Sequence, residues 1–190
     1  MEERRVTISR AKVAIDFPAS FMLISSMNPC PCGFYNHPEK ECSCAPGAVH
    51  KYLNKISGPL LDRIDLHVEV TPVPFADLNT QKNGESSDII RKRVIGARMI
   101  QAERYKNNPG IYCNAQMNSK LLKEVCAINA AGQSLLKTAM TRLSLSARAY
   151  DRILKVSRTI ADLAGSETIQ PEHLAEAITY RNLDREGWGG

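Results

Sequence analysis

Apolar residues recur at every second position between residues 5 and 15, on both sides of the basic stretch 9–12. This period of two predicts two short strands, and the basic stretch between them predicts a hairpin with a charged tip. Charges at such a tip discourage pairing with other chains. That interpretation is simpler than a finger that contacts phosphate, and the sequence alone favours it.

A second apolar run, residues 21–24, has the length of a buried strand rather than of a helix. It leads into the sequence Ser-Ser-Met-Asn-Pro, so that the amide of Asn28 is expected at the end of the strand. Ligands bind open α/β sheets at such strand ends. Residues 66–70 alternate again and predict a further strand, which completes the pattern of part of a nucleotide-binding sheet.

Helical spacing dominates the rest of the chain. A short helix is predicted within residues 46–56, and Ser57-Gly58-Pro59 is expected to end it. Residues 71–74 and 79–84 are rich in turn formers and predict a linker. The later helices are predicted at residues 86–106, 119–125, 130–142 and 146–164 and from Pro171, with Gly165 as a stop. The predicted fold class is therefore α/β followed by an all-α bundle.

Composition and charge narrow the class of protein. The chain has 190 residues, of which 43% are apolar and 24% charged, as in ordinary soluble globular proteins. Its net charge of +5 permits a nucleic-acid or phosphate partner without requiring one. No apolar run approaches the ~20 residues of a membrane span, and the charged N-terminus lacks a secretory signal. We expect a cytoplasmic protein with no membrane partner.

The six cysteines divide into two groups. Cys113 and Cys126 stand alone and are most simply core residues. The others form a C-P-C and a C-S-C pair separated by nine residues, and thiols clustered in a reducing compartment are more often metal ligands than disulfides. A cysteine-only set suits structural zinc, although the spacing is not that of C-x-x-C knuckles. We favour zinc bound by Cys30, Cys32, Cys42 and Cys44 over four unligated thiols. His37 and His50 are lesser ligand candidates and are more simply ordinary surface histidines.

Arg63 lies between two aspartates in the sequence Leu-Leu-Asp-Arg-Ile-Asp. Such an arginine usually forms a surface ion pair that contributes little to stability. Its other role would be an arginine finger, a guanidinium that stabilises the charge developing on a transferred phosphoryl group. Composition and spacing leave both interpretations open.

Several long motifs resemble one family. The sequences SSMNPCPCG, the later C-S-C, ISGPLLDRIDLHVEV and LSARAYDRILKVSRTIADLAGSETIQPEHLAEAITYR closely resemble the magnesium-chelatase-like AAA+ ATPases. Within this family, the motifs look like those of the bacterial YifB/ComM group, which includes competence-associated DNA branch-migration helicases. The resemblance covers residues 6–181. It implies ATP with Mg²⁺ as cofactor and a homo-oligomeric ring of six subunits.

The resemblance also implies roles for single residues. Asn28 matches sensor 1, which helps to position the attacking water, and Arg63 matches the arginine finger that acts on ATP bound by a neighbouring subunit. Arg148 matches the sensor 2 arginine at the start of a lid helix. The hairpin at residues 6–15 corresponds to the pre-sensor 1 hairpin, which points toward DNA in helicase relatives and here offers Arg10 and Lys12.

The chain departs from the family in one respect. It contains no G-x-x-x-x-G-K-[ST] phosphate loop and no acidic run at the end of a strand to hold Mg²⁺. Both are expected before residue 1, which makes the chain the C-terminal portion of a longer ATPase, inactive alone. Its expected parts are a C-terminal portion of the AAA+ core at residues 1–78, a linker at 79–86 and a helical lid at 87–190.

Three functions of different classes follow. The first is part of a ring-forming ATPase motor that remodels DNA, and the second is a chelatase-like or chaperone-like motor that remodels protein. The third is a non-enzymatic, zinc-stabilised interaction module. Salt-sensitive DNA binding through Arg10 and Lys12 would favour the first over the second.

Overall fold

The computed structural model of the chain describes residues 4–11, 13–73 and 84–181. Its residues group into two compact units, of which the first ends at Arg63 and the second begins at Ile64. The linker expected at residues 79–86 lies largely outside the described residues, so the domain boundaries stay a prediction. In the described part of the chain, no helix is long and apolar enough to cross a membrane.

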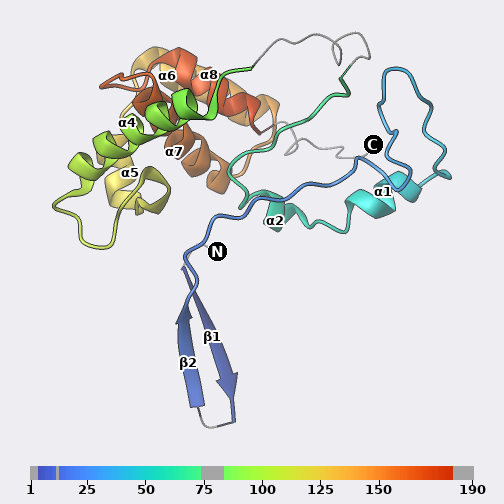
Figure 1. The fold of residues 1–190 in the computed structure, drawn as a ribbon, viewed down its shortest axis with the longest axis horizontal. Coiled ribbons are helices and arrows are strands. Elements are labelled where there is room, and N and C mark those ends of the chain that lie inside the picture. The colour runs from blue at the N-terminus through green and yellow to red at the C-terminus, as the bar shows by residue number, and fades with distance from the viewer. Residues whose placement is uncertain (1–3, 12, 74–83, 182–190) are drawn as a thin grey trace. The chain divides into compact units, whose positions relative to one another are not determined.

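A two-stranded antiparallel hairpin opens the first unit (Figure 1). Strand β1 (Arg5–Arg10) pairs with β2 (Val13–Pro18) in a register that sets Val6 opposite Phe17 and Ile8 opposite Ile15. These apolar pairs share one face because side chains opposite each other in a ladder point the same way. On the other face, the Asp16 carboxylate accepts hydrogen bonds from Arg5 and Thr7. The hairpin predicted from the period of two is confirmed.

Two short helices end the first unit. Helix α1 (Ala48–Leu53) follows Gly47, whose φ of 76° lies in the left-handed region that favours glycine. Helix α2 (Gly58–Leu61) begins after an extended Ser57 and has its proline in the first turn, where no backbone donor is needed. Helix α1 ends at Leu53, before the stop predicted at Ser57-Gly58-Pro59, and this sequence instead starts α2. Leu53 and Leu61 are the buried anchors of these helices.

The strands predicted at residues 21–24 and 66–70 are wrong for this structure. Neither segment is assigned to a strand, and the side chains of Phe21, Met22, Ile24 and Val70 are all exposed. A strand needs a neighbour that accepts and donates its ladder hydrogen bonds. Among the described residues, the sheet contains only β1 and β2, so these apolar segments have no ladder to join. The predicted α/β part is confirmed only as a hairpin with two short helices.

The second unit is helical, as predicted (Figure 1). Three N-cap side chains, those of Asn118, Asn129 and Ser146, accept a hydrogen bond from a backbone N–H of the first turn that follows, which fixes where these helices begin. Gly165, with a φ of 67°, follows the end of one helix. The elements are α4 (Ser87–Tyr105), the 3-10 helix η1 (Asn114–Gln116), α5 (Ser119–Val125), α6 (Ala130–Arg142), α7 (Ala147–Leu163) and α8 (Pro171–Thr179).

Helix α7 is the centre of the core of the second unit, since α4, α5, α8 and η1 all pack against it. Its residues Ala149 and Ile153 are buried, whereas Leu163 at its end is exposed. Helix α4 is buried at Ala97, Gln101 and Tyr105. The core itself consists of Tyr105, Met117, Leu121, Leu122, Cys126, Leu136, Leu145, Ala149, Ile153, Leu154, Ala161, Ile169, Leu174 and Ala177.

A buried ionic network ties α4 and η1 to α7. The guanidinium of Arg104 forms two hydrogen bonds to the Asp162 carboxylate, of 2.8 and 2.5 Å. Arg158 donates to the same carboxylate at 3.1 Å, and the amide of Asn114 donates to it at 2.8 Å. Burial alone would raise the pKa of Asp162, but these hydrogen bonds and the two positive charges lower it.

Candidate functional site

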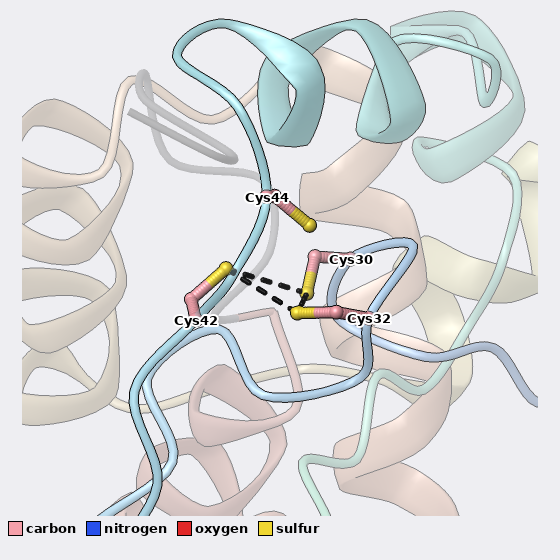
Figure 2. Close-up of side chains that lie close together, drawn as sticks. All are labelled: Cys30, Cys32, Cys42 and Cys44. Carbon is pink, nitrogen blue, oxygen red and sulfur yellow. Dashed lines mark hydrogen bonds between the residues drawn. The ribbon is translucent and has the colours of Figure 1, made fainter.

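Four cysteines of the first unit converge on one point (Figure 2). Their sulfur atoms all lie within 4.8 Å of one another. The Cys30 and Cys32 sulfurs are 3.2 Å apart, and the Cys42 sulfur lies 3.7 and 3.5 Å from these two. All four are free thiols. The fold thus brings together the four cysteines that the sequence predicts as metal ligands.

Local turns explain how the chain closes this cluster. The N–H of Gly33 donates to the carbonyl of Cys30 at 3.0 Å, which folds the first pair into a tight turn. Gly33 has a φ of 85°, a conformation that other residues adopt at a cost. Between the pairs, Nδ1 of His37 accepts hydrogen bonds from the backbone N–H groups of Glu39 and Lys40, both at 3.1 Å. This histidine therefore stabilises the connecting loop, and it is not one of the four clustered donors.

The thiols influence one another's protonation. Hydrogen bonds from the backbone N–H of Phe34 and from the Cys30 thiol lower the pKa of Cys32 to about 5. A backbone hydrogen bond from Cys32 opposes the change at Cys44, but burial and the neighbouring thiols raise the pKa of Cys44 to about 12. Four thiols this close therefore hold few negative charges unless a cation compensates them.

The dimensions of the cluster match a metal ion. A tetrahedral site with metal–sulfur bonds of ~2.3 Å has sulfur–sulfur edges of ~3.8 Å. The distances of 3.2 to 3.7 Å approach this value. A set of four thiolates leaves no coordination position for water or substrate. The donor set therefore fits a structural ion rather than a catalytic one.

Asn28 lies next to the cysteine cluster. It is exposed and precedes Cys30 by two residues. The nitrogen of its side-chain amide lies 4.0 Å from the position that a Cβ atom on Gly33 would take. The cysteine turn therefore packs beside the amide that the sequence proposes as sensor 1, and its role stays a prediction.

Arg63 is half-buried and follows the end of α2. Its Nη1 atom donates to the carbonyl of Pro59 at 2.6 Å, so the side chain folds back over the helix that precedes it. Of the two aspartates near it in sequence, Asp65 forms an ion pair of 2.9 Å with Arg152. These contacts do not test the proposed role of Arg63 as arginine finger, which stays a prediction.

Arg148 and Arg10 are both exposed. Arg148 is in the first turn of α7 and belongs to the second unit. Arg10 is the last residue of β1, and Lys12 lies outside the described residues. Because Arg148 is in a different unit from Asn28 and Arg63, the convergence of the three on one nucleotide stays a prediction.

Sequence reasoning missed a set of buried arginines. Arg158 and Arg181 are 2% and 0% exposed, and Arg181 donates through Nη1 to the carbonyl of Ile64. The spacing of Arg158 and Asp162, four residues apart on one helix, was a signal for an ion pair. No local signal existed for Arg181, because its partner is 117 residues away.

Several known proteins are similar in sequence to almost the whole of this chain. Competence protein ComM of Haemophilus influenzae is 45% identical to the chain over 186 residues. Uncharacterized proteins named YifB from Salmonella typhimurium and Escherichia coli are each 38% identical over 187 and 186 residues. Each match covers 97% of this chain and 35% of the relative, so the chain spans about a third of the length of these curated relatives.

Two family descriptions cover almost all of the sequence. The family described as "Magnesium chelatase, subunit ChlI" matches residues 1–78, and the one described as "Magnesium chelatase, subunit ChlI C-terminal" matches residues 84–181. The second match alone includes more than half of the chain. The resemblance inferred from the sequence motifs is thereby confirmed, and the chain belongs to the magnesium-chelatase-like family of AAA+ ATPases.

Proposed function

We propose that the chain supplies sensor 1, the arginine finger and sensor 2 to a ring-forming AAA+ ATPase that remodels DNA in the cytoplasm. The observation that carries this proposal is the 45% identity to a competence protein over 97% of the chain. Residues 1–78 form the C-terminal portion of the ATPase core in this proposal, and residues 87–190 form the lid. The family's nucleotide chemistry implies ATP and Mg²⁺ as cofactors.

Arg63 is the proposed arginine finger. A guanidinium keeps its charge at every physiological pH, and its forked donors match the oxygens of a phosphoryl group. One of its contacts is the hydrogen bond that Nη1 donates to the Pro59 carbonyl; in the proposal, a phosphate oxygen of a neighbouring subunit's nucleotide replaces this acceptor. The finger acts on charge that develops only in the transition state, so it contributes to turnover more than to binding.

Asn28 and Arg148 are the proposed sensors. The exposed amide of Asn28 can orient a water molecule by donating and accepting hydrogen bonds. Arg148 projects from the first turn of a 17-residue helix, where the helix dipole also favours a phosphate. The two residues would report on the γ-phosphate of the subunit's own nucleotide.

The cysteine cluster is the proposed zinc site. Cys30, Cys32, Cys42 and Cys44 offer the four soft donors that a closed zinc site uses. Zinc would neutralise the clustered thiolates and fix the loop that follows Asn28. Its contribution is therefore structural, and it takes part in no step of hydrolysis.

The test of the main proposal is the substitution Arg63→Ala in the complete ATPase that carries this sequence. Loss of a finger is expected to reduce kcat by a factor of about 10³ while nucleotide affinity stays nearly constant. Arg142→Ala is the matched control, because Arg142 is an exposed arginine at the end of α6. Turnover that survives Arg63→Ala at the level of this control would contradict the proposal.

The family description supports a second candidate function. Because the matching family is described as a magnesium chelatase subunit, the ring can instead act as a chelatase-like or chaperone-like motor that remodels protein. A non-enzymatic, zinc-stabilised interaction module is the third candidate, and it predicts that Arg63→Ala leaves every activity unchanged. DNA binding through the hairpin separates the first candidate from the second.

A further inference from the structure

The segment directly after Arg63 is fastened to the helical unit. The backbone N–H of His67 donates to the carbonyl of Tyr180 at 2.9 Å, and Arg181 donates to the carbonyl of Ile64. Between these points, Arg152 forms an ion pair of 2.9 Å with Asp65. Residues 64–67 are thus held at three places by residues of α7 and of the chain just after α8, and this set of contacts is called the clamp below.

Burial distinguishes the clamp from incidental surface contacts. Arg181 is 0% exposed and His67 is 7% exposed, whereas Leu66 and Val68 on either side of His67 are exposed. Burying an arginine is unfavourable unless its donors find acceptors, and the Ile64 carbonyl is one of them. The segment therefore buries the His67 side chain and bonds two of its backbone groups to the helical unit, while the apolar side chain of Leu66 stays exposed.

The clamp lies next to two of the residues proposed to contact nucleotide, Arg63 and Arg148. Arg63 is joined to Ile64 by one peptide bond, so their Cα atoms are ~3.8 Å apart. Arg152 follows Arg148 by one turn of α7, which places both on the same side of that helix. The helix of the proposed sensor 2 is therefore connected to the proposed finger by the ion pair between Arg152 and Asp65 and by the backbone of Ile64.

We infer that the clamp positions the arginine finger, with Arg152 and Arg181 as positioning residues that make Arg63 follow the helical unit. This inference rests on the proposed finger role of Arg63. When Arg148 binds the nucleotide of its own subunit, the lid shifts. Residues 64–67 then move with the lid, because the clamp joins them to it. The finger offered to the neighbouring subunit then moves with the nucleotide state of its own subunit, which couples adjacent sites in a ring.

The first experiment measures docking of the segment on this chain by amide hydrogen exchange. The substitution Asp65→Asn removes one carboxylate charge that is partly exposed to solvent, and it keeps the shape of the side chain. Exchange of the His67 amide is expected to become at least tenfold faster, while the amides of α6 stay protected. Glu124→Gln on the exposed surface of α5 is the control. Unchanged exchange at residue 67 in both Asp65→Asn and Arg152→Gln would overturn the inference.

The second experiment measures turnover in the complete ATPase. Asp65→Asn and Arg152→Gln are each expected to reduce kcat by about tenfold with an unchanged KM for ATP, since small misplacements of a catalytic group are costly. The decisive variant combines Arg63→Ala with Asp65→Asn. If the clamp acts through Arg63, the double variant turns over no more slowly than Arg63→Ala alone, because residues that act as a unit are not additive.

The outcomes separate this inference from the proposed function. An additive loss in the double variant means that Asp65 acts independently of the finger and overturns the inference alone. A normal kcat in Asp65→Asn, with a collapsed kcat in Arg63→Ala, also overturns it and leaves the finger in place. A normal kcat in Arg63→Ala overturns both. Arg181→Lys provides a further check, since it keeps the charge of the buried side chain but loses its forked geometry.

Discussion

Asp162 is the acceptor at the centre of the buried ionic network of the helical unit. Its carboxylate is 2% exposed and accepts hydrogen bonds from two arginines and from Asn114. Removing one partner from such a network leaves charges buried without compensation, which costs about 3–5 kcal/mol. Because the arginines come from α4 and α7, the carboxylate joins elements 58 residues apart in the sequence.

We expect Asp162→Asn to lower the free energy of unfolding by about 3–5 kcal/mol at pH 7. The pKa of Asp162 is lowered in the folded state, so its stabilising effect is complete above the unfolded value of ~3.9 and is lost as the pH falls through the folded pKa. The wild-type chain should therefore lose stability below about pH 4, and Asp162→Asn should lose less. Urea denaturation at pH 7 and pH 3 measures both effects. Equal acid sensitivity of the two proteins would contradict the role given to this carboxylate.

The elements differ in how well the sequence predicts them, and the reason is physical. Helices α5 and α6 begin and end as predicted, because capping residues and apolar spacing act within a few residues. The apolar run at residues 21–24 looks like a strand, but a strand is completed by a partner that may lie anywhere in the chain. The cysteine cluster could be predicted from its two local pairs. The clamp could not, since Arg181 and Ile64 are 117 residues apart.

The loop that carries the cysteines, residues 28–44, should depend on a metal ion for its order. We expect one zinc ion per purified chain, and we expect a chelator to expose four additional thiols to titration. Cys42→Ser removes one of the four donors and should reduce the zinc content, because a closed site needs its full ligand set. The control is Cys113→Ser, which lies outside the cluster. Elemental analysis with thiol titration measures the result, and a zinc-free chain whose four clustered thiols titrate before chelation would contradict the metal site.

At the scale of the whole molecule, the position of the basic residues is a better guide to DNA binding than the mild net charge of +5. The β1–β2 hairpin is exposed along both strands, and the sequence between Ser9 and Val13 contains the basic residues Arg10 and Lys12. DNA affinity that arises from phosphate contacts falls as salt rises, with a slope of about 0.9 per phosphate neutralised. If the motor binds DNA through the hairpin, its DNA affinity must therefore depend less steeply on salt concentration when Arg10 and Lys12 are neutralised.

We expect Arg10→Ala with Lys12→Ala in the complete ATPase to reduce the salt dependence of DNA binding by about two phosphate contacts and to weaken binding equally across sequences. Lys92→Ala with Arg98→Ala, at two exposed basic residues of α4, is the matched control, because it removes the same number of positive charges outside the hairpin. Titration of labelled DNA at several salt concentrations gives the slope. If the tip variant and the control bind DNA alike while ATP hydrolysis remains intact, the ring does not read DNA through this hairpin. The protein-remodelling motor then becomes the better account, since its nucleotide chemistry through Arg63 and Arg148 needs no nucleic acid.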